Sequence, residues 1–202
     1  MALLERDEDL SRLTELLRVA VEGRGGIAAV SGVVGSGKTE LLDTLARRAA
    51  ELGLLVLGAT GVRAERSVPL GVLSQLLLQA DLSVAGAERV AQLLDAGVSQ
   101  IRTTENGPDP VAPVPIRIMH GLYEVLHDIA RQTPVLVTVD DTHWADSASL
   151  QCLLYLVRRL RSARLVVVFA ESEHALRANP LFRTELLREP RCLWMHTTRL
   201  SV

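Results

Sequence analysis

The sequence predicts an α/β protein with three layers, in which helices cover both faces of a mostly parallel, five-stranded sheet. Segments with apolar residues at helical spacing alternate along the chain with short apolar runs. These runs are apolar throughout and do not alternate with polar residues, which is typical of strands buried on both faces of a parallel sheet. Because no repeat of fixed period interrupts this order, we expect residues 1–202 to form a single domain.

The first half of the chain contains four predicted helices and two predicted strands. The first helix has acidic residues at its start, where the helix dipole favours negative charge, and a leucine-rich stripe behind them. Glycines follow the first two helices and predict their ends. The predicted helices are 5–22, 38–51, 70–78 and 87–96, and the predicted strands are 27–31 and 54–59.

The second half begins with a loop over residues 103–115, because four of the eight prolines fall between positions 108 and 115. Helices and strands then alternate again. The predicted helices are 116–131, 147–161 and 180–187, and the predicted strands are 135–139, 165–170 and 191–197.

The composition excludes several classes of protein. A net charge of −2 argues against a dedicated nucleic-acid-binding module. The two cysteines lie 40 positions apart, which disfavours a disulfide scaffold and a cysteine zinc site. The charged, acidic start is neither a signal peptide nor a transit peptide, and no apolar run is long enough to cross a membrane. We therefore expect a soluble cytoplasmic protein without a membrane partner.

Residues 32–39 read GVVGSGKT and match the pattern G-x-x-x-x-G-K-[ST] between a predicted strand and a predicted helix. The glycines let backbone N–H groups turn towards phosphate oxygens, and the start of the following helix favours the same anion. Lys38 is the only lysine among 22 basic residues, and we expect it to contact the β- and γ-phosphates and to contribute to catalysis. Thr39 offers a hydroxyl to Mg²⁺. The expected nucleotide-binding residues are Gly32, Val33, Val34, Gly35, Ser36, Gly37, Lys38, Thr39 and Glu40.

This pattern predicts a phosphate-binding loop for ATP with Mg²⁺; the alternative is a glycine-rich turn that only joins a strand to a helix. A second signal comes from residues 135–141, VLVTVDD, where an apolar strand ends in two acids. Ligands of open α/β sheets bind at the carboxyl ends of strands. We expect Asp140 to bind Mg²⁺ and Asp141 to orient the attacking water as a catalytic base. The alternative is that both acids only cap the turn.

Three further residues follow in the same segment. His143 either relays the state of the γ-phosphate or is satisfied by local hydrogen bonds. Trp144 is expected to pack in the core rather than to stack on adenine. Asp146 or Ser147 is expected to be the N-cap of the next helix.

The chain resembles the N-terminal ATPase domain of the large ATP-binding transcriptional regulators of the LuxR type, which are STAND-class signal-transduction NTPases. The resemblance covers essentially all 202 residues. It rests on LLERDEDL (3–10), GVVGSGKT (32–39), ERSVPLGVLSQLL (65–77), VDDTHWAD (139–146) and NPLFRTELLR (179–188).

The resemblance implies a bacterial switch domain that binds ATP, hydrolyses it slowly and often self-associates. It also implies that DNA is bound only by a C-terminal helix-turn-helix, which this chain lacks. The chain ends where the helical lid of the family would begin, so we expect a truncated domain. By the same resemblance Arg6 would meet the adenine. Relatives carry a sensing arginine after the fourth strand, where this chain has residues 171–173, ESE, with Arg177 nearby.

Two other functions are consistent with the same motifs. A small-molecule kinase of the phosphate-binding-loop class would need an acceptor pocket and an arginine-rich lid, whereas the arginines of residues 61–115 are scattered. A module that binds nucleotide without hydrolysing it would need Lys38 but not Asp141.

Overall fold

Strands and helices alternate along the chain in the computed structural model, which describes residues 7–104, 113–159, 163–173 and 178–198. The helices are α1 (Asp7–Val21), α2 (Lys38–Glu51), α3 (Gly71–Leu78), α4 (Val84–Thr104), α5 (Ile116–Gln132), α6 (Ser147–Val157) and α7 (Pro180–Leu187), with short 3₁₀ turns η1 (Arg63–Glu65) and η2 (Thr142–Trp144). The strands are β1 (Gly26–Gly32), β2 (Leu55–Thr60), β3 (Val135–Asp140), β4 (Leu165–Ser172) and β5 (Cys192–Thr197).

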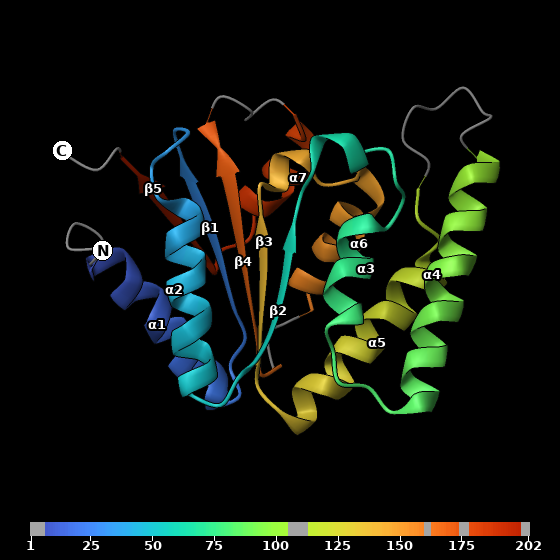
Figure 1. The fold of residues 1–202 in the computed structure, drawn as a ribbon, viewed down its shortest axis with the longest axis horizontal. Coiled ribbons are helices and arrows are strands. Elements are labelled where there is room, and N and C mark those ends of the chain that lie inside the picture. The colour runs from blue at the N-terminus through green and yellow to red at the C-terminus, as the bar shows by residue number, and fades with distance from the viewer. Residues whose placement is uncertain (1–6, 105–112, 160–162, 174–177, 199–202) are drawn as a thin grey trace.

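All five strands pair in parallel, in the order β2-β3-β4-β1-β5 (Figure 1). The predicted fold class is therefore confirmed. In this order β4 lies between β1 and β3, and the carboxyl ends of the three strands meet at one edge of the sheet. The loop that follows β1 and the acids that end β3 are thereby brought to the same edge.

The side chains of each strand alternate between two apolar layers, one on each face of the sheet. Val166 and Val168 of β4 pack in the layer that contains α1 and α2. Leu165 and Val167 pack in the opposite layer, to which α3, α5, α6 and α7 contribute. Figure 1 shows α1 and α2 on one side of the sheet and α3, α5 and α6 on the other. This double burial explains why the strand sequences are apolar throughout.

Helix α4 is much longer than its predicted range, 87–96, because it runs through Gly97 to Thr104. A Cβ atom at Gly97 would lie 2.6 Å from Cδ1 of Leu70 and 3.2 Å from Cγ2 of Ile118. This close packing favours glycine at a position inside the helix. Helix α4 packs against α5 on the outer side of the molecule (Figure 1).

The other boundaries differ from the predictions by a few residues. The helix predicted to reach position 161 ends at Val157, and most of the proline-rich segment 103–115 lies outside the described residues. Within the described ranges, Cys152 and Cys192 are free thiols, and no helix has the length and apolar character needed to cross a bilayer.

Candidate nucleotide-binding site

The loop between β1 and α2 has the backbone shape that its glycines predict. Gly35 and Gly37 adopt φ values of 78° and 80°, which residues with a Cβ atom rarely adopt. Helix α2 begins directly after them at Lys38, so its N-terminal N–H groups point towards the space above the loop. This end of the helix attracts an anion.

Gly32 is required for a different reason, the close approach of β5. A Cβ atom at Gly32 would lie 2.1 Å from Oγ1 of Thr197 and 2.5 Å from its carbonyl oxygen. The Thr197 hydroxyl donates to the Ser31 carbonyl at 3.1 Å and lies 2.8 Å from the buried Ser36 hydroxyl. The edge strand therefore anchors the loop from below.

The ammonium of Lys38 lies beneath this loop and is almost fully buried, with 8% of the residue exposed. Its Nζ atom donates to the carbonyls of Gly32 at 3.0 Å and Val33 at 2.9 Å. A buried charge without such partners would cost several kcal/mol, so these carbonyls hold the lysine in place. Lys38 nevertheless lines the cleft above the loop.

Thr39 and Asp140 connect the loop to the end of β3. The Thr39 hydroxyl donates to Oδ2 of Asp140 at 2.6 Å, and Oδ1 of Asp140 accepts from the backbone N–H of Asp141 at 2.8 Å. A hydroxyl and a carboxylate that meet at one point are oxygen donors of the kind that Mg²⁺ prefers. No group of three or more His, Cys, Asp or Glu residues that could hold a metal occurs in the described ranges. The oxygen atoms of Thr39 and Asp140 fit Mg²⁺, which usually takes one or two protein oxygens together with phosphate and water.

Asp141 follows in a left-handed conformation, with φ 44°. Asp and Asn tolerate this region better than other residues with a side chain. A Cβ atom at Gly61 would lie 2.4 Å from the Asp141 carbonyl, so glycine at the end of β2 makes room for this turn. Partial burial and the neighbouring Asp140 carboxylate raise the pKa of Asp141, while His143 and Lys38 oppose the shift. A higher pKa makes the carboxylate a stronger base.

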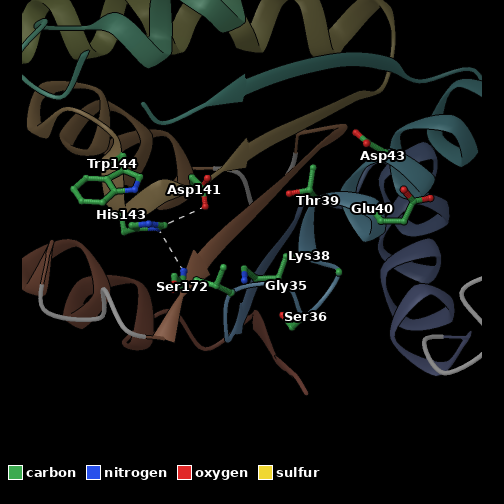
Figure 2. Close-up of a pocket in the computed structure, with 12 residues that line it drawn as sticks. Gly35, Ser36, Lys38, Thr39, Glu40, Asp43, Asp141, His143, Trp144 and Ser172 are labelled. Atoms are coloured by element: carbon green, nitrogen blue, oxygen red, sulfur yellow. Dashed lines mark hydrogen bonds and ion pairs between the residues drawn. The ribbon is translucent and has the colours of Figure 1, made fainter. Parts of the chain in front are cut away.

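His143 lies between the ends of β3 and β4, as Figure 2 shows. Its Nδ1 atom accepts a hydrogen bond from the backbone N–H of Ser172 at 3.4 Å and lies 3.9 Å from Oδ1 of Asp141. The ring is buried, and this burial is the largest cause of a lowered pKa, which favours the neutral form. His143 is therefore hydrogen-bonded locally and also lies close to Asp141, the candidate base.

Ser172 is a cleft residue for which the sequence predicted no role. Its side chain is buried and lines the cleft, yet its Oγ atom has no hydrogen-bond partner within the part of the chain that the structure describes. Buried hydroxyls normally have a partner, so this atom is available to a ligand. The signal in the sequence is a polar residue in the segment 171–173, which follows the apolar run 165–170.

The expectation for Trp144 is wrong: the residue is half-buried and lines the cleft instead of packing in the core. The guanidinium carbon of Arg63, from η1, lies 5.4 Å from the centre of its ring. Asp146, rather than Ser147, is the N-cap of α6, where Oδ1 accepts from the Ser149 N–H at 2.8 Å.

Together these residues enclose a cleft of about 580 Å³, which is within the range of small-molecule sites. Of the predicted nucleotide-binding residues, those at 34–40 line it, together with Asp43 and Asp141. Gly32 and Val33 contribute their carbonyls to Lys38 behind the loop. Arg6 and Arg177 lie outside the described residues.

Comparisons with known proteins agree with this geometry. Residues 2–168 match the sequence profile of a family described as the AAA ATPase domain. No curated protein matches the chain. Among solved structures, similar ones are the ORC2 protein of Aeropyrum pernix in ADPNP–ADP complexes (TM-score 0.54, 18% identity) and the ORC1 protein of Aeropyrum pernix in complex with DNA (TM-score 0.54, 20% identity). Drosophila ORC bound to DNA is also similar (TM-score 0.52, 16% identity).

The alignments cover 96%, 97% and 95% of this chain but only 48%, 46% and 42% of those three chains. The chain therefore spans about half the length, or slightly less, of the structures it resembles. At these identities the similarity shows the fold.

Proposed function

Because the chain belongs to the AAA ATPase domain family, we propose that it binds ATP with Mg²⁺ in this cleft and hydrolyses it with water. The observation that carries the proposal is the 2.6 Å hydrogen bond between Thr39 and Asp140. It joins the loop after β1 to the acidic end of β3, which supports adjoining sites for phosphate, metal and water in this proposal.

Binding rests on the loop and the start of α2. The N–H groups at this helix end offer hydrogen bonds and a positive dipole to the phosphates. Lys38 exchanges its contacts with the Gly32 and Val33 carbonyls for the β- and γ-phosphates, and it is already confined beneath the loop. Thr39 and Asp140 would hold Mg²⁺, which neutralises phosphate charge when it is bound.

In the proposed hydrolysis, Asp141 is the general base. A water positioned by this carboxylate attacks the γ-phosphorus, the bond to the β-phosphate oxygen breaks, and ADP and phosphate leave. Asp141 accepts the proton of the water, and its raised pKa suits this task. The ring of His143 lies beside Asp141, and the hydroxyl of Ser172, which has no partner among the described residues, is available to the γ-phosphate or the water.

We further propose that the chain is the switch domain of a bacterial transcriptional regulator. The motifs at 3–10, 65–77, 139–146 and 179–188 support this context through their resemblance to LuxR-type regulators. In this proposal ATP and ADP states differ in self-association, and a separate helix-turn-helix domain contacts DNA. Slow hydrolysis, which the resemblance to such regulators implies, is part of this proposal.

The test is phosphate release by the purified chain with ATP and Mg²⁺, with and without a mixture of small hydroxyl compounds as phosphate acceptors. We expect phosphate to be released without an acceptor and no phosphorylated compound to form. Phosphoryl transfer that requires an acceptor would instead favour the kinase. Tight ATP binding without turnover in a long single-turnover assay would favour the module that does not hydrolyse.

A further inference from the structure

We propose that Asn179 is a positioning residue, whose side-chain amide holds the η2 turn so that His143 and Asp141 keep their places in the cleft. The proposal rests on the proposed hydrolysis but has a structural part that is tested separately. It starts from an anomaly at the beginning of α7. Asn179 is the N-cap of this helix, a position where Asn normally accepts a hydrogen bond from the first turn, yet its side chain makes no such bond.

The amide is directed to a different element instead. Its Nδ2 atom donates to the carbonyls of Thr142 at 3.2 Å and His143 at 3.4 Å, two consecutive residues of η2. Both hydrogen bonds of the amide group thereby go to one short turn, whose residues Thr142 and His143 lie 37 and 36 positions before Asn179 in the chain. The Asn179 side chain does not cap α7 but binds η2. Its role is therefore to hold η2 rather than to stabilise its own helix.

Arg66 fixes the orientation of this amide. Its guanidinium donates to Oδ1 of Asn179 at 3.3 Å and to the Ala178 carbonyl at 2.7 Å. Because Oδ1 accepts from a cation, the amide cannot rotate to exchange its oxygen and nitrogen without placing two donors together. The nitrogen therefore faces η2. We call the group formed by Arg66, Asn179 and the two η2 carbonyls the η2 brace.

The turn that the brace holds carries the chemistry of the cleft. Asp141 is the N-cap of η2, and its carbonyl accepts from the Trp144 N–H at 2.8 Å. His143, inside the turn, lies 3.9 Å from Asp141, which directly follows β3, and accepts from the Ser172 N–H on β4. A displacement of η2 thus moves the candidate base and separates the ring from both strand ends.

The decisive variant is Asn179→Asp. Asp has the same shape and is as good an N-cap as Asn, and it still accepts from Arg66, so the stability of α7 is retained. A carboxylate, however, cannot donate to the carbonyls of Thr142 and His143. Thr184→Asp is the matched control, because it adds the same charge to an exposed position of α7. Asn179→Gln, which retains both donors, is the conservative variant for rescue.

Two readouts separate the brace from the proposed hydrolysis. The first is the kcat and KM of phosphate release. We expect kcat of Asn179→Asp to fall on the order of 10- to 100-fold, the scale of a small misplacement of reacting groups, with little change in KM. The second is acrylamide quenching of Trp144, which ends η2, in a Trp194→Phe background without nucleotide. We expect quenching to increase in Asn179→Asp, to stay at the parental level in Thr184→Asp, and to recover in part in Asn179→Gln.

The outcomes are distinct. Unchanged kcat in a folded Asn179→Asp variant would overturn the positioning role, and so would an equal loss of kcat in Thr184→Asp. If the parent chain releases no phosphate, the proposed function fails. The quenching of Trp144 fluorescence then tests by itself whether Asn179 holds η2. Stronger quenching in Asn179→Asp than in the parent chain supports the role of Asn179 in holding η2, whereas equal quenching in the two refutes it.

Discussion

Lys38 is held in the folded chain by two carbonyl oxygens that a nucleotide can replace. Its Nζ atom is 3.0 Å from the Gly32 oxygen and 2.9 Å from the Val33 oxygen, beneath the loop that its own helix follows. The chain has one lysine and many arginines, and the confined space beneath the loop suits a compact ammonium better than a planar guanidinium.

Lys38→Ala should weaken ATP binding by about 2–3 kcal/mol, because a charge-assisted contact to the β- and γ-phosphates is lost. Isothermal titration calorimetry with ATP and Mg²⁺ measures this change. Arg18→Ala, which removes an exposed cation from α1, should leave the affinity unchanged. Equal affinities of the parent and a folded Lys38→Ala variant would refute the assignment of the phosphate site.

Asp141→Asn should lower hydrolysis on the order of 10²- to 10⁴-fold, the usual contribution of a positioned general base, with ATP affinity nearly unchanged. The amide cannot accept the proton, whereas Asp140 and Thr39 remain to bind Mg²⁺. Asn also tolerates the left-handed backbone at this position, so the fold should be retained. Single-turnover assays with labelled ATP measure the rate, and binding is measured in parallel. Parental hydrolysis in this variant would reduce Asp141 to a turn residue.

Among the elements, α3 and α6 are joined at their N-termini by one carboxylate. Asp146 is 4% exposed, and its Oδ1 accepts from the N–H groups of Ser149 and Leu70 at 2.8 and 2.9 Å. Its Oδ2 accepts from the Val72 N–H at 3.2 Å. Leu70 has a φ of 60°, a strained conformation for leucine, and the carboxylate stabilises it there.

Asp146→Ala should lower the free energy of unfolding by about 3 kcal/mol or more, because three buried N–H groups lose their acceptor. Urea denaturation followed by circular dichroism measures the change. Ser147→Ala is the control at the neighbouring exposed position and should shift stability by less than about 0.5 kcal/mol. Similar losses in the two variants would contradict the assignment of Asp146 as the bridge.

The reactivity of the two cysteines depends on how well the whole molecule stays folded. Burial is the main cause that raises the pKa of both Cys152, on α6, and Cys192, on β5, to about 12. A thiol with a raised pKa favours the folded state at low pH, and this contribution is lost as the pH rises from the ordinary thiol range towards 12. At pH 8 both thiols are therefore protonated and unreactive.

Alkylation with iodoacetamide at pH 8 should be slow for both cysteines in the native protein and fast in denaturant. Cys192 should react before Cys152, because it lies at the start of the edge strand and is only half-buried. Mass spectrometry of digests taken over time gives the two rates. Rapid labelling of Cys152 under native conditions would show that α6 opens without global unfolding.

Over the whole chain, local patterns alone predicted the fold class. Continuous apolar runs such as 165–170 are sufficient for a buried parallel strand, since both faces of the sheet are covered. The GVVGSGKT segment predicted the loop, because its glycines at 35 and 37 encode a backbone shape that neighbouring residues do not alter. The Asp140–Asp141 pair at the end of an apolar run likewise marked the edge at which the loop and the acids meet.

The tertiary structure alone decided which remote residues complete the site. Local patterns do not predict the roles of Ser172, Arg66 and Asn179, because these roles depend on β4 lying between β1 and β3 and on α7 packing beside η2. The predicted helix 87–96 was too short and the expectation for Trp144 was wrong for the same reason. The packing of Gly97 depends on Leu70, and the exposure of Trp144 depends on the cleft wall. Periodicity records which face of an element is buried, but contacts between distant segments arise only when the strands take their order in the sheet.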